Sequence, residues 1–178
     1  IPASMNYGVL TFIENTHVTD PPSRWTHRKQ IPEHNTFRFM PPYDAQRQSD
    51  ADIEIAPSFR DDICLRVCTE KTVDYIARHA DEAKAGRPFF IYLALNSPHL
   101  PHCAAPEFAG TSKVDAYGDF MLETDHRVGQ VLAALDQHGL TRDTLVLQTS
   151  DNGPETGYAE RLKTYAHASN GGLKGGKR

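Results

Sequence analysis

Residues 88–99 read Pro-Phe-Phe-Ile-Tyr-Leu-Ala-Leu-Asn-Ser-Pro-His, and this stretch decides the fold class of the chain. The run from Phe89 to Leu95 is apolar and does not alternate with polar residues, which is typical of a short strand buried on both faces. The run stops at a polar tip that begins with Asn96. A strand of this kind lies inside a sheet that helices cover on both sides.

The segments on either side of that run complete the pattern. Before it, apolar residues recur at helical spacing from Asp62, and Gly86 ends the predicted helix. After it, we expect a second helix over 116–138 and a second buried strand over 144–149. The order helix, strand, helix, strand predicts an α/β fold with a mostly parallel central sheet and flanking helices.

The two ends of the chain differ in character. Residues 1–62 carry most of the prolines and show little sustained period, so we expect a loop-rich segment. Residues 63–178 carry the α/β core, and the two segments together form a single domain. The chain opens on Ile1-Pro2 without an initiator Met and closes on a glycine-rich stretch. We therefore expect an internal fragment of a longer domain, incomplete at both ends.

Composition excludes several classes of protein. The 178 residues carry 19 Lys and Arg against 23 Asp and Glu, a formal net charge of −4. Without a basic cluster, a nucleic-acid-binding surface is not expected. No apolar run approaches the ~20 residues that a transmembrane helix needs. Three cysteines are an odd number and too few for a disulfide scaffold, and they do not assign a compartment.

Polar residues follow both predicted strands, at the edge where α/β sheets bind ligands. At the second tip, Asp151 and Asn152 place a carboxylate beside an amide carbonyl, and such hard oxygen donors suit Ca²⁺ or Mg²⁺. The residue types in the same stretch, 150–154, are also typical of a turn. Spacing alone therefore does not distinguish a metal site from a turn without a ligand. At the first tip, His99 is either an acid, base or anion contact near neutral pH or a solvated loop histidine.

The remaining histidine and cysteine candidates are weaker as functional residues. His102 is a weaker candidate than His99. The three cysteines have no second pair of metal ligands nearby, so we expect them to pack as small hydrophobic residues. They are Cys64, Cys68 and Cys103.

Taken together, these segments resemble the formylglycine-dependent sulfatase family of the alkaline phosphatase superfamily. Four motifs match in the family's order, at residues 88–99, 117–129, 145–154 and 169–177. A thinner match covers the start of the chain. The resemblance implies that the chain is part of the N-terminal catalytic domain of a sulfatase, with an alkaline-phosphatase-like sandwich fold. It also implies hydrolysis of a sulfate monoester, a reaction that we do not expect the fragment to perform alone.

The resemblance further implies roles for individual residues. Asp151 and Asn152 correspond to ligands of a divalent cation, usually Ca²⁺, with Mg²⁺ as the alternative. His99 corresponds to the histidine that contacts the sulfate ester and assists its departing oxygen. Lys177 corresponds to the lysine that reaches the sulfate, and Ser4 to a serine on the substrate side. A cation, an ammonium and an imidazolium together would stabilise the anionic oxygens of the ester.

The family's nucleophile is a Cys or Ser of a C/S-x-P-S-R motif that is converted to formylglycine, and this motif is not in the chain. Residues 20–24, Asp-Pro-Pro-Ser-Arg, imitate its tail but place Asp at the convertible position, so we expect a surface turn there. The implied partners are a formylglycine-generating or sulfatase-maturing enzyme and a substrate that is a small sulfate ester or a sulfated glycan. The family's usual location is periplasmic, secreted or lysosomal.

Two alternatives stay open at this stage. One is a phosphate or phosphonate ester hydrolase of the same superfamily, because the same charges suit both oxyanions. The other is a non-catalytic binding homologue that has lost the formylglycine.

Overall fold

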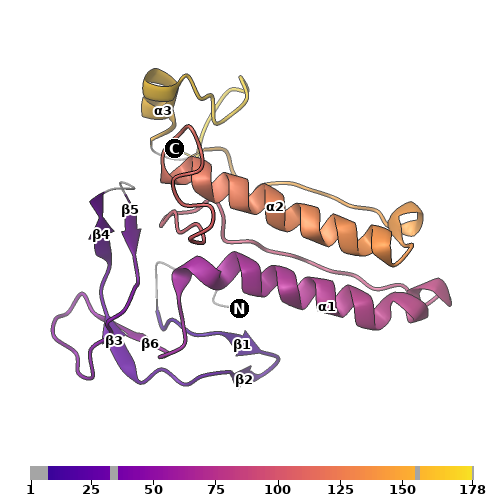
Figure 1. The fold of residues 1–178 in the computed structure, drawn as a ribbon, viewed down its shortest axis with the longest axis horizontal. Coiled ribbons are helices and arrows are strands. Elements are labelled where there is room, and N and C mark those ends of the chain that lie inside the picture. The colour runs from indigo at the N-terminus through magenta and orange to yellow at the C-terminus, as the bar shows by residue number, and fades with distance from the viewer. Residues whose placement is uncertain (1–7, 33–35, 155–156, 178) are drawn as a thin grey trace.

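The computed structural model describes residues 8–32, 36–154 and 157–177. Two long helices, α1 (Cys64–Lys84) and α2 (Ala116–Gln137), lie side by side (Figure 1). Short strands from the first part of the chain gather near the end where α1 begins. A third helix, α3 (Tyr158–Tyr165), lies near the start of α2.

The two long helices begin and end where local chemistry allows it. A 3-10 turn, η2 (Asp61–Ile63), leads into α1, and Gly86 follows the helix with a φ of +85° that favours glycine. The carboxylate of Asp115 caps α2 by accepting a hydrogen bond from the Tyr117 amide at 2.9 Å. Gly139 follows α2 with a φ of +66°. Both helices are confirmed close to their predicted ends.

In the part of the chain that the structure describes, the strands form three two-stranded antiparallel ribbons. The pairs are β1 (Ile13–Glu14) with β2 (His17–Val18), β3 (Arg24–Thr26) with β6 (Ile53–Ile55), and β4 (Lys29–Ile31) with β5 (Thr36–Arg38). Leu10 adds a single parallel bridge to Ile55. A second 3-10 turn, η3 (Thr141–Asp143), follows α2.

The two segments expected to be buried strands are extended but unpaired, which corrects that prediction. Residues 89–95 and 144–149 form no strand pairing within the described part of the chain. Figure 1 shows each segment returning along the helices towards the end where α1 and α2 begin. The two segments therefore run in the same direction, as predicted. The expected parallel hydrogen bonding between these segments is not seen.

The burial pattern along residues 89–95 also corrects the expectation that this segment is buried on both faces. Side chains of an extended chain point alternately to opposite faces. Phe89 and Ile91 pack against the apolar cluster between α1 and α2, whereas Phe90 and Tyr92 are 87% and 83% exposed. The segment is thus covered by helices on one face only. An unbroken apolar run cannot distinguish this arrangement from burial on both faces.

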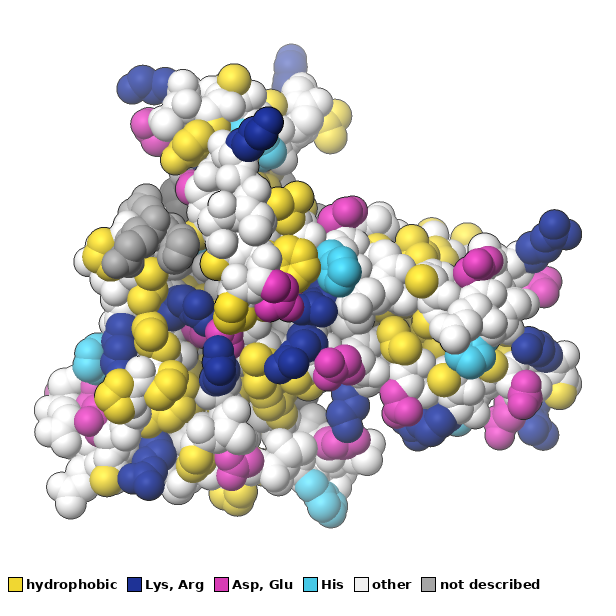
Figure 2. Space-filling view, in the orientation of Figure 1, with side chains coloured by type: hydrophobic (Ala, Val, Ile, Leu, Met, Phe, Trp, Pro, Cys, Tyr) yellow, Lys and Arg dark blue, Asp and Glu magenta, His cyan; other side chains and the backbone are white. Residues whose placement is uncertain are grey.

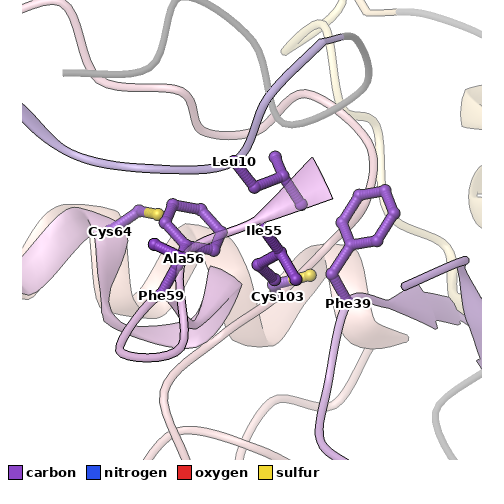
Figure 3. Close-up of a cluster of buried hydrophobic side chains, with 7 residues drawn as sticks. All are labelled: Leu10, Phe39, Ile55, Ala56, Phe59, Cys64 and Cys103. Carbon is purple, nitrogen blue, oxygen red and sulfur yellow. The ribbon is translucent and has the colours of Figure 1, made fainter. Parts of the chain in front are cut away.

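A separate apolar cluster joins the ribbons to the helical part (Figure 3). It brings together buried residues from the first part of the chain, from the start of α1 and from the segment that follows residue 99. Its members are Leu10, Phe39, Ile55, Ala56, Phe59, Cys64 and Cys103. This core therefore fixes the ribbons against the segment that carries the first polar tip.

The cysteines are buried, as predicted, and Cys103 also donates a hydrogen bond to Asp61. Cys64, Cys68 and Cys103 are buried free thiols, and burial raises the pKa of each. No helix within residues 8–32, 36–154 and 157–177 has the length and apolar character needed to cross a bilayer.

Candidate functional site

The loop after residues 144–149 and the loop near the end of the chain lie against each other. The amide of Lys177 donates a hydrogen bond to the carbonyl oxygen of Pro154 at 3.0 Å. A Cβ atom at Gly153 would lie 3.3 Å from the Cα atom of Gly176. This approach is tight, and glycines on both sides permit it. The fold therefore brings the backbone of Lys177 next to the segment that carries Asp151 and Asn152.

Asp151 and Asn152 are exposed on a short turn. The hydroxyl of Ser150 donates to the carbonyl oxygen of Asn152, and the Asn152 Nδ2 donates to the carbonyl oxygen of Gly153, each at 2.9 Å. The second bond uses the side-chain amide nitrogen of Asn152. The side-chain carbonyl oxygen is therefore the atom that Asn152 can offer to a cation as a ligand. Together with the Asp151 carboxylate it makes a pair of hard oxygen ligands.

This pair fits Ca²⁺ or Mg²⁺ as part of a ligand set. Ca²⁺ takes about 6–8 oxygen ligands, so further ligands are needed to complete a site. Within the described ranges, no group of three or more His, Cys, Asp and Glu side chains is arranged to hold a metal ion. The donors present are therefore chemically suitable, and they make up only a fraction of a full coordination shell.

His99 lies on the loop that follows residues 89–95, and its side chain is exposed. Its amide donates to the carbonyl oxygen of Asn96 at 3.0 Å, which closes a turn. Its ring Nδ1 lies 2.6 Å from the carbonyl oxygen of Leu100. Since a carbonyl oxygen only accepts, Nδ1 carries the hydrogen in this contact, and the ring orientation is fixed by the backbone.

Hydrogen bonds from other elements hold the loop that carries His99. The hydroxyl of Thr124 on α2 donates to the Ser97 hydroxyl at 2.7 Å. The hydroxyl of Thr36 on β5 donates to the carbonyl oxygen of His102 at 3.3 Å. The loop is therefore attached on both sides of His99.

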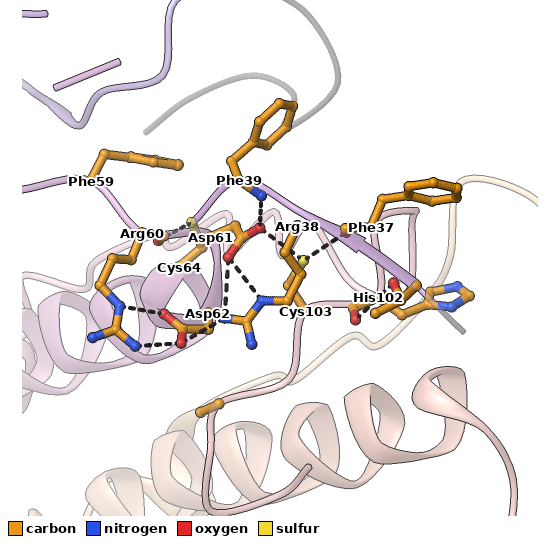
Figure 4. A network of polar contacts seen from close by, with 12 residues as sticks. Phe37, Arg38, Phe39, Phe59, Arg60, Asp61, Asp62, Cys64, His102 and Cys103 are labelled. Atoms are coloured by element: carbon orange, nitrogen blue, oxygen red, sulfur yellow. Dashed lines mark hydrogen bonds and ion pairs between the residues drawn. The ribbon is translucent and has the colours of Figure 1, made fainter. Parts of the chain in front are cut away.

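A buried polar network continues from this loop (Figure 4). The Sγ of Cys103 donates to Asp61 Oδ2 at 3.1 Å, and the amide of Phe39 donates to the same oxygen at 2.7 Å. Arg38 pairs with Asp61 Oδ1 at 3.2 Å. Burial raises the pKa of Asp61, while the Arg38 guanidinium opposes that shift. The network fixes the end of the His99 loop to β5 and to the turn before α1.

Helix α3 docks on the start of α2 through a cluster that sequence reasoning did not identify. The guanidinium of Arg161 lies 4.1 Å from the centroid of the Tyr117 ring and 3.6 Å from Asp115 Oδ2. The rings of His102 and His167 lie 5.5 Å and 5.9 Å from the Tyr117 ring. We call these five residues the Tyr117 cluster. A lone arginine in a polar stretch gives no sequence signal of such docking.

The candidate residues are thus distributed over three loops at one end of the helices. The structure brings Lys177 to the loop of Asp151 and Asn152, and it places His99 on a separately anchored loop. Ser4 lies outside the described residues. Figure 2 shows acidic and basic side chains interspersed over the visible face, in keeping with the small net charge.

Comparison with known proteins identifies the family. The sequence model described as Sulfatase matches residues 5–178, so the chain belongs to the sulfatase family. An N-acetylgalactosamine-6-O-sulfatase of Bacteroides thetaiotaomicron is 32% identical over 123 residues, covering 67% of this chain and 23% of the relative. The steryl-sulfatase of Mus musculus is 44% identical over 106 residues, covering 56% and 17% respectively.

A solved structure supports the same fold. It is described under the metabolism of multiple glycosaminoglycans by Bacteroides thetaiotaomicron, and it matches with a TM-score of 0.71 at 26% identity. The match covers 99% of this chain and 41% of that chain. The α/β fold class is therefore confirmed. The chain spans less than a quarter of the length of the two curated relatives named above.

Proposed function

We propose that this chain forms part of a sulfatase that hydrolyses a sulfate monoester with the help of a divalent cation. The observation that carries the proposal is the contact between the two loops at Pro154 and Lys177. It brings the backbone of Lys177 to the segment that carries Asp151 and Asn152, the two side chains that we propose as cation ligands. A sulfate group has anionic oxygens, so a site that combines an ammonium with a bound cation suits it.

We assign a role to each residue. Asp151 and Asn152 bind the cation, Ca²⁺ in preference to Mg²⁺, and the cation when bound withdraws charge from the ester oxygens. Lys177 binds the sulfate through its ammonium group. His99 in its protonated form gives a proton to the oxygen that leaves. Ser4 contacts the substrate.

The nucleophile in this proposal is a formylglycine outside this chain, made by a sulfatase-maturing enzyme. The substrate is a sulfated glycan or a small sulfate ester. A phosphate or phosphonate ester would present a similar oxyanion. An assay therefore has to distinguish these esters from sulfate esters. Aryl sulfates, aryl phosphates and aryl phosphonates offered side by side to the complete protein identify the preferred ester.

The cation role predicts a joint loss in the complete protein. Asp151→Ala is expected to lower bound Ca²⁺ and turnover together, because it removes the charged ligand. Asp143→Ala, which changes an exposed carboxylate before the same segment, is the matched control and should change neither. Metal analysis by mass spectrometry and the rate of aryl sulfate hydrolysis are the measurements. Full turnover by a metal-depleted Asp151→Ala protein would remove this assignment.

The acid role predicts a dependence on the leaving group. His99→Ala is expected to slow alkyl sulfates by about 10²–10³-fold and activated nitrophenyl sulfates much less, since a good leaving group departs without a proton. The ratio of the two turnover rates is the readout. Equal losses on both substrates would show that His99 is not the acid.

A further inference from the structure

Gly153 lies where the loop of the proposed cation ligands meets the segment that leads into Lys177. A Cβ atom at Gly153 would lie 3.3 Å from the Cα atom of Gly176, 3.6 Å from its carbonyl carbon and 3.7 Å from the carbonyl oxygen of Gly175. The first of these distances is shorter than the separation that two carbon atoms prefer. A side chain at position 153 therefore fits only if one of the two loops moves.

Position 153 requires space and not an unusual backbone. Positive φ values, which favour glycine, occur in the segment before Lys177, at Gly171, Gly172 and Gly175. Gly153 is not among the residues of positive φ. An alanine can therefore adopt the backbone conformation of Gly153, and the cost of its methyl group comes from the contact with Gly176 alone.

The tight contact lies beside the hydrogen bond that joins the two loops. The carbonyl carbon of Gly176 is bonded to the Lys177 nitrogen, and this nitrogen donates to the Pro154 carbonyl oxygen at 3.0 Å. Pro154 directly follows Gly153. The contact and the hydrogen bond thus connect the same two pairs of neighbouring residues, so a displacement at the contact also changes the hydrogen bond and the position of Lys177.

The two sides of the contact differ in their freedom to move. The turn that ends at Gly153 is held by its own side chains, because the Ser150 hydroxyl donates to the Asn152 carbonyl oxygen and the Asn152 Nδ2 donates to the Gly153 carbonyl oxygen. On the other side, a Cβ atom at any of the three glycines of positive φ would meet nothing within 4 Å. The glycine-rich segment before Lys177 therefore has room to yield.

We propose that Gly153 is a positioning residue for Lys177: because Gly153 has no side chain, the Lys177 segment closes onto the turn of Asp151 and Asn152. Gly153 thereby sets the spacing between the sulfate-binding lysine and the cation ligands. This inference rests on the sulfate-binding role proposed for Lys177. A larger residue at position 153 displaces Lys177 and leaves the two cation ligands in place.

The test is Gly153→Ala in the complete protein. The KM for a nitrophenyl sulfate is expected to rise about tenfold, because a contact between the ammonium and the sulfate is weakened. The amide of Lys177 should exchange its hydrogen about tenfold faster, since its acceptor is displaced. Bound Ca²⁺ should not change. Gly129→Ala on α2 is the matched control and should change none of these quantities, because a Cβ atom there meets nothing within 4 Å.

A double-mutant cycle with Lys177→Ala decides whether Gly153 acts through the lysine. Lys177→Ala should raise KM by itself, and adding Gly153→Ala to it should produce no further rise. Additive increases would overturn the inference. A loss of bound Ca²⁺ in Gly153→Ala would also contradict it, because the displacement would then affect the turn of the cation ligands. A Gly153→Ala protein that does not fold would show that the segment before Lys177 cannot yield, which contradicts it as well.

Failure of the underlying function looks different. In that case Lys177→Ala itself leaves KM unchanged, whatever the substitution at position 153 does. Hydrogen exchange at the amide of residue 177 needs no substrate, so it still decides the spacing role. Faster exchange in Gly153→Ala would support that role, and unchanged exchange would remove it.

Discussion

Glu123 is a carboxylate with no exposed surface, and its oxygens connect two segments. One oxygen accepts the Ala105 amide at 2.7 Å, and the other accepts the Arg127 Nε at 3.0 Å. Burial raises the pKa of Glu123, while these two donors oppose the shift. The residue therefore ties the segment after the His99 loop to α2, at the cost of desolvating a charge.

Truncation of Glu123 is expected to be far more damaging than truncation of its exposed neighbour in the same network. Glu123→Ala leaves the buried Arg127 without its main partner and should lower the free energy of unfolding by about 3–5 kcal/mol. Glu107→Ala removes an ion pair of 3.2 Å to the same arginine, but Glu107 is exposed, so the loss should be below about 1 kcal/mol. Urea denaturation compares the two variants. Equal losses would mean that burial does not set the strength of this network.

Helix α3 is a short element that its own sequence cannot stabilise. An isolated helix needs about 12–15 residues to be even marginally stable in water, and α3 has 8. Gly157 before it and Ala166 after it both have positive φ, so the helix cannot extend in either direction. Arg161 is its buried side chain. We infer that docking of Arg161 on the Tyr117 cluster holds α3 in place.

Removal of that docking group is expected to release α3 without unfolding the molecule. In Arg161→Ala, amide hydrogen exchange over 158–165 should accelerate at least tenfold, while exchange in the middle of α2 should not change. Lys163→Ala on an exposed position of the same helix is the control and should preserve protection. Peptide-resolved mass spectrometry makes the measurement. Unchanged protection in Arg161→Ala would show that other contacts hold the helix.

At the level of elements, sequence periodicity predicted what depends on local chemistry. Both long helices could be located because their apolar spacing lies within the helices and a glycine, Gly86 or Gly139, follows each of them closely in the sequence. The extended segment at 89–95 could be located from the sequence, but its lack of strand pairing could not, since pairing depends on neighbours distant in sequence. Helix α3 was not predicted, because an arginine on an aromatic ring holds it rather than an apolar stripe.

The same division applies to the candidate site. His99, Lys177, Asp151 and Asn152 were chosen because each lies in a short motif, and their roles stay proposals. His102 was set aside because a loop histidine carries no local mark of its environment. Its environment depends on a ring contact with Tyr117 of α2, a residue that only the folded chain brings near it.

The free energy of unfolding of the whole molecule should depend on pH through the titration of His102. Burial and Arg161 lower its folded pKa to about 4 from 6.5, with Asp115 opposing and His99 adding to the shift. Between these two values the unfolded chain binds more protons than the folded chain, so stability rises with pH there. The contribution of His102 is complete above pH 6.5 and is lost as the pH falls to 4, an amount of about 3 kcal/mol.

The prediction is a change in the difference between two proteins. Other groups titrate in both the wild type and His102→Gln, so their effects cancel, whereas the amide does not titrate. The free energy of unfolding of the wild type minus that of His102→Gln should therefore fall by about 3 kcal/mol between pH 7 and pH 4. Urea unfolding at pH 7, 5.5 and 4 provides the values, with His102→Asn as a second reference. A difference that stays constant over this range would mean that the His102 imidazole is exposed to water. A difference that grows on acidification would mean that Asp115 raises the pKa of His102 by more than Arg161 and burial lower it.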